Sequence, residues 1–360
     1  MLSIEMLPAR QGDALWVEYG VPSRRLLVDG GPAETWKHLK ARIEAQPLEE
    51  RHFELLLISH IDIDHIGGAR PLLEQAGDLG VTFGDIWFNG YRHLPETPIE
   101  SLGPVQGEVL TTLLVGERYP WNEAFHRRAI VVPNGDDAPP SRELEGGLAV
   151  TVLSPGPAQL ERLRPIWSAE VTKHGLNPKV EPEPPTPLPK GVEALGAAPD
   201  VAQLAATPFH PDTAAPNGTS VALLLELKDG PSAVVAADAF PSVLQQSVGR
   251  LLRERGQRRL RLEAFKLPHH GSRANTNRGL LELIDCPLHL FSTDGTQTRH
   301  PDREAVARVL DTATQNVSLG FNYLSDQNEV WRDPGTVERY GYGLRCPDPG
   351  EAGLAVTLRA

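Results

Sequence analysis

The stretch from Leu55 to Gly68 constrains this sequence more than any other. Its apolar residues 55–58 have the length of a buried strand and are too short for a helix. Four side chains that can bind a metal follow this run: His60, Asp62, Asp64 and His65. Ligands at this spacing cannot share one face of a regular helix or strand. We therefore expect a loop at a strand end, with the four side chains converging on one point.

Two glycines and a proline after these ligands predict how the chain continues. Gly67 and Gly68 allow the backbone to pass close to the centre, and Pro71 indicates the first turn of a helix over residues 69–76. The positive N-terminus of that helix would favour an anionic ligand at the same place. A solvated polar turn is the alternative interpretation. We favour the metal site, because clustered histidines and carboxylates repel one another unless a cation lies between them.

Further donors follow later strands. Asp238 ends an apolar run, where an unpaired carboxylate is unfavourable, so we expect it to bridge two metals. Of the adjacent His269 and His270, we expect His269 to be the ligand because it lies nearest the strand end. His270 is the alternative ligand, and otherwise a group that orients a ligand or transfers protons. His300 is placed equally well at the site or at the entry to a helix.

The hydrophobic pattern alternates strands with helices, which is typical of an α/β sandwich. Strands are expected over residues 2–6, 14–19, 25–29, 54–59, 85–93, 127–132, 148–154, 219–227, 232–238, 262–268 and 287–293. Helices are expected over residues 33–46, 69–76, 101–116, 157–167, 200–205, 241–256 and 302–310. Asp13 and Asp29 lie beside turn glycines, either as turn residues or as groups that orient ligands.

With 360 residues, 40% of them hydrophobic, the chain can bury a full core. We expect one domain over residues 1–154 and 217–316, with a C-terminal extension, 317–360, packed on it. The intervening residues 155–216 are rich in proline, which predicts an extended insertion. This insertion is a candidate lid or protein-binding arm, and an inert surface loop is the alternative.

The pattern His60-x-Asp62-x-Asp64-His65-x-Gly67-Gly68 resembles the signature of the metallo-β-lactamase superfamily, which usually has histidine at the second position. The aspartate variant is similar to the hydrolase domain of bacterial competence DNA-uptake channel proteins and their soluble relatives. Further matches occur in the family's order at residues 11–14, 26–31, 266–272 and 300–301. The resemblance implies a four-layer αββα sandwich, with metals at one edge of the paired sheets.

In that fold we expect two divalent metal ions, zinc or manganese. His60 and Asp62 would hold one, Asp64, His65 and His269 the other, with Asp238 between them. Asp62 makes the first position richer in oxygen, which favours manganese or magnesium over zinc. A metal-bound hydroxide would be the nucleophile, and Asp64 and His270 are the predicted catalytic residues.

One ligand of the family is missing. The superfamily normally has a further histidine just before the strand that begins at Thr219, and this chain has Asn217 there, with His210 upstream. Either Asn217 or His210 would complete the first metal position, or the ion there would be labile.

The composition indicates which kinds of substrate and which cellular compartment to expect. A net charge of −12 argues against tight non-specific binding of duplex DNA and favours a small or single-stranded anionic substrate. The only dense basic segment is residues 250–261. No run of 18 apolar residues and no signal-peptide pattern is found, so we expect a cytoplasmic protein. The predicted function is a metal-dependent phosphodiesterase or nuclease; a lactone, thioester or lactam hydrolase, or a non-catalytic scaffold that binds a protein partner, is the alternative.

Overall fold

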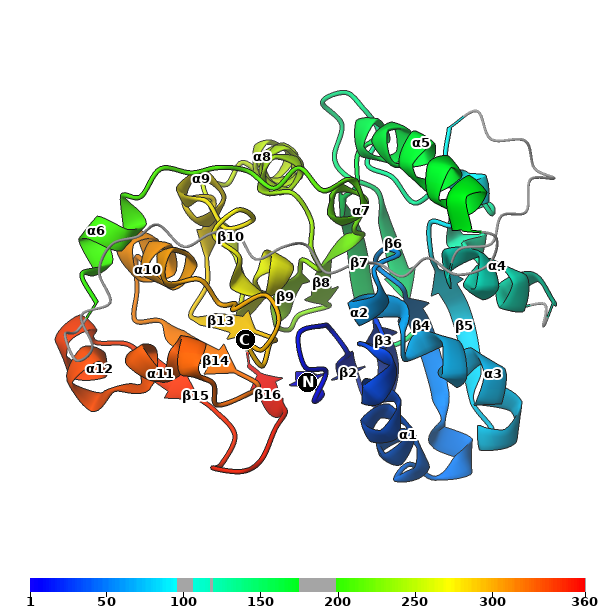
Figure 1. Ribbon diagram of the computed structural model, residues 1–360, viewed down its shortest axis with the longest axis horizontal. Coiled ribbons are helices and arrows are strands. Elements are labelled where there is room, and N and C mark those ends of the chain that lie inside the picture. The colour runs from blue at the N-terminus through cyan, green and yellow to red at the C-terminus, as the bar shows by residue number, and fades with distance from the viewer. Residues whose placement is uncertain (96–105, 117–118, 175–198, 360) are drawn as a thin grey trace.

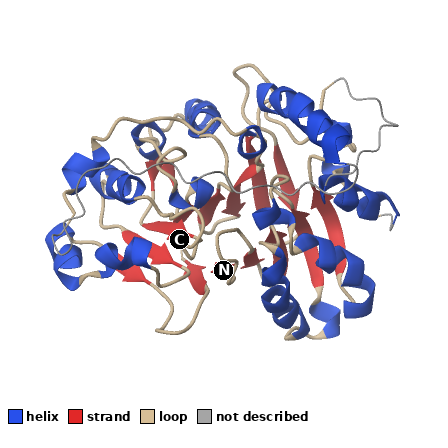
Figure 2. Ribbon diagram, in the orientation of Figure 1, coloured by secondary structure: helices blue, strands red, loops and turns tan. Residues whose placement is uncertain are grey.

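The computed structural model of the protein describes residues 1–95, 106–116, 119–174 and 199–359. Two mixed sheets form its centre (Figures 1 and 2). The first sheet contains, in order across it, β16 (Leu354–Leu358), β1 (Leu2–Met6), β2 (Leu15–Tyr19), β3 (Arg24–Val28), β4 (His52–Leu57) and β5 (Thr82–Trp87). The second contains β15 (Gly343–Arg345), β14 (Ser318–Phe321), β13 (Leu288–Phe291), β11 (Ala264–Lys266), β9 (Ser232–Val235), β8 (Ala222–Leu227), β7 (Leu148–Ser154) and β6 (Ser141–Leu144). A short parallel pair joins β10 (Leu260–Arg261) to β12 (Ile284–Asp285).

Helices flank the two sheets on their outer sides, as Figure 2 shows. Those before residue 175 are α1 (Trp36–Glu44), α2 (Ile63–Ile66), α3 (Ala69–Leu79), α4 (Gln106–Gly116) and α5 (Pro157–His174). Those after residue 198 are α6 (Val201–Ala205), α7 (Ala215–Gly218), α8 (Pro241–Arg255), α9 (Arg278–Leu281), α10 (Arg303–Thr312), α11 (Asp326–Arg332) and α12 (Pro334–Tyr340). Short 3-10 turns are η1 (Ala33–Thr35), η2 (Leu48–Glu50), η3 (Tyr91–His93), η4 (Glu123–Phe125) and η5 (Pro268–Gly271). No described helix is long and apolar enough to cross a membrane.

Buried side chains separate into three layers, and β4 shows why. Its residues alternate, so that Leu55 and Leu57 join the cluster between the two sheets while Leu56 joins the cluster beneath α1 and α3. On β8, Leu224 likewise faces the opposite way from its neighbours, into a third cluster beneath α8 and α10. Three apolar layers between helix, sheet, sheet and helix confirm the predicted four-layer αββα sandwich.

The strand directions bring the predicted ligands to one edge. Strands β3, β4 and β5 are parallel, as are β9, β11 and β13, so each set has its carboxyl ends at one edge of its sheet. A hydrogen bond from Val221 N to Ser59 O, at 2.9 Å, joins these two edges. Loops that follow parallel strands are where open α/β sheets bind ligands.

Two local predictions are wrong, and one strand was not predicted. Residues 127–132 form no strand, because the side-chain amide of Asn89 donates to Ile130 O and accepts from Ile130 N, both at 2.8 Å, and so replaces a neighbouring strand. The strand β6 was not expected. The ligand segment is not a loop throughout, since α2 closes one helical turn immediately after Asp62.

The proline-rich insertion is only partly extended. Its first part is the helix α5, longer than the predicted 157–167, and it buries Trp167 against the outer face of the first sheet. The predicted helix near 200–205 is confirmed as α6. Residues 175–198, which hold six of the 13 prolines of the insertion, lie outside the described residues, as do residues 101–105 of another predicted helix.

The C-terminal segment supplies strands to both sheets. Strand β16 pairs antiparallel with β1, and β14 and β15 extend the second sheet beyond β13. In Figure 1 the red β16 lies beside the N-terminus, at the centre of the molecule. This segment is therefore built into the sheets, while the domain limits given above stay predictions.

Candidate metal centre

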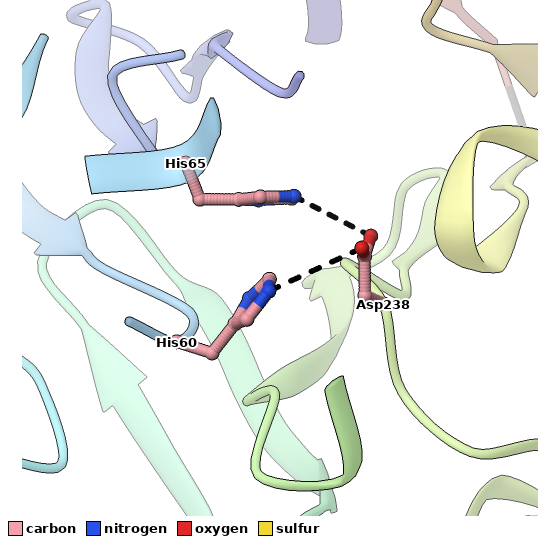
Figure 3. A group of neighbouring side chains, drawn as sticks. All are labelled: His60, His65 and Asp238. Carbon is pink, nitrogen blue, oxygen red and sulfur yellow. Dashed lines mark ion pairs between the residues drawn. The ribbon is translucent and has the colours of Figure 1, made fainter. Parts of the chain in front are cut away.

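Three chain segments deliver the predicted ligands to one place. His60 follows β4, and Asp64 and His65 lie on the single turn of α2. Asp238 follows β9, and the two adjacent histidines lie in η5, after β11. Figure 3 shows the rings of His60 and His65 pointing toward Asp238. The predicted convergence of distant strand ends is present in the structure.

Four imidazole rings face the carboxylate of Asp238. On its Oδ1 side, the Nε2 atoms of His65 and His270 lie 3.5 Å and 3.6 Å away. On its Oδ2 side, the Nε2 atoms of His269 and His60 lie 3.7 Å and 4.0 Å away. The carboxylate therefore lies between two pairs of histidines, as a bridging group would.

The two other carboxylates of the signature lie on opposite sides. Asp62 Oδ2 is 3.5 Å from His60 Nε2, whereas Asp64 Oδ2 is 3.9 Å from His270 Nε2. Donor atoms within 4.8 Å of one another group His60 with His65 and Asp238, and Asp64 with His65 and His270. Within the described part of the chain, His269 belongs to no group this tight. The geometry thus places His270, the alternative left open by the sequence, beside Asp64 and His65.

The buried donor atoms fit a bound cation. Nε2 of His60, of His65 and of His270, and Oδ1 of Asp238, are all buried without a hydrogen-bond partner. Buried polar atoms normally have partners, because leaving them unpaired costs about 1–3 kcal/mol each. Two donors held about 2.1 Å from a tetrahedral zinc ion lie about 3.4 Å apart, close to the separations around Asp238. The donor set therefore suits a divalent metal.

The far nitrogen of each ring on the first sheet is held by the protein. His65 Nδ1 lies 2.8 Å from Asp29 Oδ2, and that buried carboxylate accepts hydrogen bonds from the backbone N and Oγ of Ser59, both at 2.7 Å. Ser59 Oγ lies 3.0 Å from His60 Nδ1. Partners of this kind fix the ring orientation of metal-binding histidines. Asp29 therefore holds the ring of His65, a predicted ligand, and is not only a turn residue.

Asp13 lies behind His270, at a longer distance than Asp29 behind His65. Asp13 Oδ1 lies 3.5 Å from His270 Nδ1, and Asp13 Oδ2 forms an ion pair with Lys266. Both side chains of the ion pair are fully buried. Burial by itself raises the pKa of the Asp13 carboxyl, but the charges of Lys266 and His270 lower it below its ordinary value. Asp13 is therefore a carboxylate in the folded protein.

A polar cluster that the sequence did not reveal surrounds His269. Its Nδ1 lies 3.0 Å from Asn275 Oδ1 and 3.5 Å from Asp212 Oδ2. Asp212 Oδ2 accepts hydrogen bonds from Asn217 Nδ2, at 2.8 Å, and from Asn275 Nδ2, at 3.0 Å. Asp212 lies in the insertion, far along the chain from the motif residues, so no spacing rule could have identified it.

None of the tentative ligands has a contact with Asp238 among the described residues. The side-chain amide of Asn217 is directed at Asp212, and His210 is exposed and belongs to no donor group among the described residues. His300 lies beside the site, with its ring centroid 5.2 Å from that of His269 and its Nδ1 3.4 Å from Asp302 Oδ2. The structure therefore gives no support for metal binding by Asn217, His210 or His300. The assignments of the other metal ligands stay predictions.

Charge and backbone conformation are both unusual at the centre. Burial raises the pKa of Asp238, but the nearby His269, His65 and His270 lower it well below its ordinary value. Burial lowers the pKa of His269, yet Asp238 and Asp212 raise it to about 10. Ala237, His269 and His270 all have positive φ, of 44°, 46° and 55°. Such strain in non-glycine residues is concentrated at functional sites.

Comparison with known proteins places the chain in a family. The model of the metallo-beta-lactamase superfamily matches residues 7–295, most of the 360-residue chain. A metallo-beta-lactamase with an HARLDQ motif, from Cronobacter sakazakii (Enterobacter sakazakii), is a solved structure with 13% identity and a TM-score of 0.31, covering 73% of this chain and 76% of that chain. MEM-A1, a subclass B3 metallo-beta-lactamase isolated from a soil metagenome library, has 13% identity and a TM-score of 0.30, covering 93% of this chain and 94% of that chain. No curated protein matches the chain. The narrower resemblance to competence proteins stays a prediction.

Proposed function

Because the chain belongs to the metallo-beta-lactamase superfamily, a family of metal-dependent hydrolases, we propose that it hydrolyses phosphodiesters of nucleotides or single-stranded nucleic acid. The observation that carries the proposal is the set of unpaired buried donor atoms on both sides of Asp238. A site with two histidines facing each carboxylate oxygen of Asp238 suits phosphoryl chemistry, in which two cations stabilise the attacking and leaving oxygens.

In this proposal, residues of the chain would bind the metal ions and hold one another in position. Asp62 and Asp64, with the four histidines around Asp238, would hold two divalent cations, manganese or zinc. These cations supply a water of lowered pKa and stabilise negative charge on the substrate. Carboxylates lie behind three of the rings and the Ser59 hydroxyl lies behind the fourth, so each Nε2 is directed at the centre before substrate arrives.

Two arginines support an anionic substrate. Arg10 lies in the loop that ends at Asp13, and its carbonyl accepts a hydrogen bond from the backbone N of Asp294, at 2.9 Å, in the loop that leads to His300. Arg299 precedes His300 in that second loop. Both arginines are exposed and, among the described residues, neither forms an ion pair. Positive charge in the loops that lead to Asp13 and His300 would attract a phosphodiester.

The basic segment at residues 250–261 gives less support than the sequence suggested. Arg255 forms a two-pronged pair with Glu226, at 2.7 and 2.8 Å, and Arg250 donates to Pro133 O, at 2.7 Å. Arg253 lies 3.4 Å from Asp136. These three of the six arginines of the segment have neighbours of their own, whereas Arg10 and Arg299 lie in the loops that lead to Asp13 and His300 and are the better candidates for substrate contact.

The test is hydrolysis of bis-p-nitrophenyl phosphate and of a single-stranded oligonucleotide, with Mn²⁺ or Zn²⁺ added to metal-free protein. We expect turnover that depends on the metal, is lost in Asp64→Asn, and is unchanged in His210→Ala, which alters an exposed histidine outside the centre. Arg299→Ala should raise KM for the oligonucleotide while kcat changes little. Turnover of lactones, thioesters or lactams alone would contradict the phosphodiesterase assignment, and inactivity of the metal-loaded protein on every substrate would leave a partner-binding scaffold.

A further inference from the structure

The structure contains two adjacent histidines where the family pattern needs one, and none where the pattern needs another. Asn217 occupies the position that normally carries a histidine, and its amide is directed at Asp212 rather than at Asp238. His269 and His270 follow β11 in sequence, and both rings face Asp238, with an interplanar angle of 74° between them. The positive φ of both residues makes this possible, because a regular strand or helix would not direct consecutive side chains at the same carboxylate.

We propose that His269 replaces the missing histidine of the first metal position, while His270 belongs to the second position. This inference rests on the proposed metal centre. The two rings contact different oxygens of Asp238. His269 shares Oδ2 with His60, at 3.7 and 4.0 Å, and His270 shares Oδ1 with His65, at 3.6 and 3.5 Å.

The remaining carboxylates follow the same division. Asp62 lies beside His60, and Asp64 lies beside His270. The first position would therefore have His60, Asp62, His269 and one oxygen of Asp238. The second would have Asp64, His65, His270 and the other oxygen. Each position then has two histidines and two carboxylates, so the departures from the family pattern at Asp62 and Asn217 leave neither position short of donors.

Asp212 is the positioning residue for His269. It accepts from Asn217 and Asn275 and lies 3.5 Å from His269 Nδ1, so the ring presents Nε2 to Asp238. The backbone N of His269 also donates to Ala237 O, at 2.8 Å, which ties the ring to the segment carrying Asp238. Asp29 and Asp13 are placed in the same way behind the histidines of the second position. In this arrangement Asn217 acts as a partner of Asp212 and not as a metal ligand.

The experiment counts bound Mn²⁺ by elemental analysis and by electron paramagnetic resonance, which reports whether two ions are magnetically coupled. The wild-type chain should bind two coupled ions. His269→Ala and His270→Ala should each bind one ion with an uncoupled signal, and His210→Ala, the matched control at an exposed histidine, should bind two. Circular dichroism and thermal unfolding of the metal-free variants verify that each one folds.

Double variants test the division itself. His60→Ala combined with His269→Ala removes two donors from one position, so one ion should remain. His60→Ala combined with His270→Ala damages both positions, so no ion should remain. Asp212→Asn should lower the affinity for one ion by about 10- to 100-fold and leave the affinity for the other unchanged.

The outcomes separate this inference from the proposed function. A wild-type chain that binds neither Mn²⁺ nor Zn²⁺ overturns both. Two ions in the wild type and two of unchanged affinity in His269→Ala overturn the inference alone. The reverse pattern of the double variants, with one ion left in His60→Ala/His270→Ala and none in His60→Ala/His269→Ala, also overturns it, because it would place His269 with His65.

Discussion

Replacing Lys266 by methionine should lower the free energy of unfolding by about 3–5 kcal/mol. Lys266 and Asp13 are both fully buried and form an ion pair, so the variant leaves the Asp13 carboxylate buried without its cation. Methionine has nearly the length of lysine and keeps most of its packing, so the loss reports mainly the unpaired charge. The effect is large because neither group has water to replace the partner.

A double-mutant cycle isolates the pair. Asp13→Asn alone leaves a buried lysine, whereas Lys266→Met combined with Asp13→Asn removes both charges, so the double variant should be less destabilised than the sum of the single variants by about 1–3 kcal/mol. Arg255→Met is the control, since Arg255 and Glu226 form a well-aligned pair at the surface, with side chains 30% and 28% exposed. That variant should cost at most about 1 kcal/mol.

Urea denaturation of the metal-free protein at pH 7 measures these free energies. The pKa of Asp13 is lowered in the folded state, so its contribution is present above the unfolded value of 3.8 and is lost only as the pH falls through the lower folded value. The difference between Lys266→Met and wild type should therefore be constant between pH 6 and 8. A cost for Lys266→Met no greater than that for Arg255→Met would refute the reasoning.

Three further predictions concern packing and pH. Gly12→Ala should lower the free energy of unfolding by about 1–3 kcal/mol and weaken metal binding, because its new Cβ would lie 1.8 Å from Asp64 O. Urea denaturation and Mn²⁺ titration test this. The control is Gly77→Ala, whose new Cβ would have nothing within 4 Å, and it should be neutral or stabilising. Burial lowers the pKa of His289 to about 4, so the unfolded chain binds more protons between pH 4 and 6.5 and stability falls by about 3 kcal/mol as the pH decreases through that range. In His289→Leu the urea midpoint should change less between pH 7 and 4.5 than in the wild type. The same pH dependence in both proteins would contradict this prediction. His269 has a pKa of about 10 and is therefore protonated at pH 7 in the metal-free protein. Binding of Mn²⁺ should release protons and become tighter at higher pH. Calorimetric heats of Mn²⁺ binding that are the same in every buffer would exclude this.

The sequence predicted the features that depend on neighbouring residues. The apolar run 55–58 predicts the buried strand β4, and the close spacing of His60 and His65 predicts convergence. Each of these depends on local geometry with a fixed period, which is why a pattern reveals it. The strand expected at 127–132 failed because an apolar pattern does not reveal a side chain that takes over the backbone hydrogen bonds.

Only the tertiary structure decided which groups orient the ligands and which oxygen each ring faces. Asp13 and Lys266 are 253 residues apart in sequence, and Asp212 and Asn275 are 63 apart, so their contacts exist only once both sheets are packed. His269 and its neighbour are equivalent in any sequence pattern and become different through left-handed backbone conformations that the surrounding fold imposes. By itself, the sequence determined the fold and the kinds of donor atom at the centre. Their division between two sides of one carboxylate was set by packing, because it depends on distances between segments that no local spacing encodes.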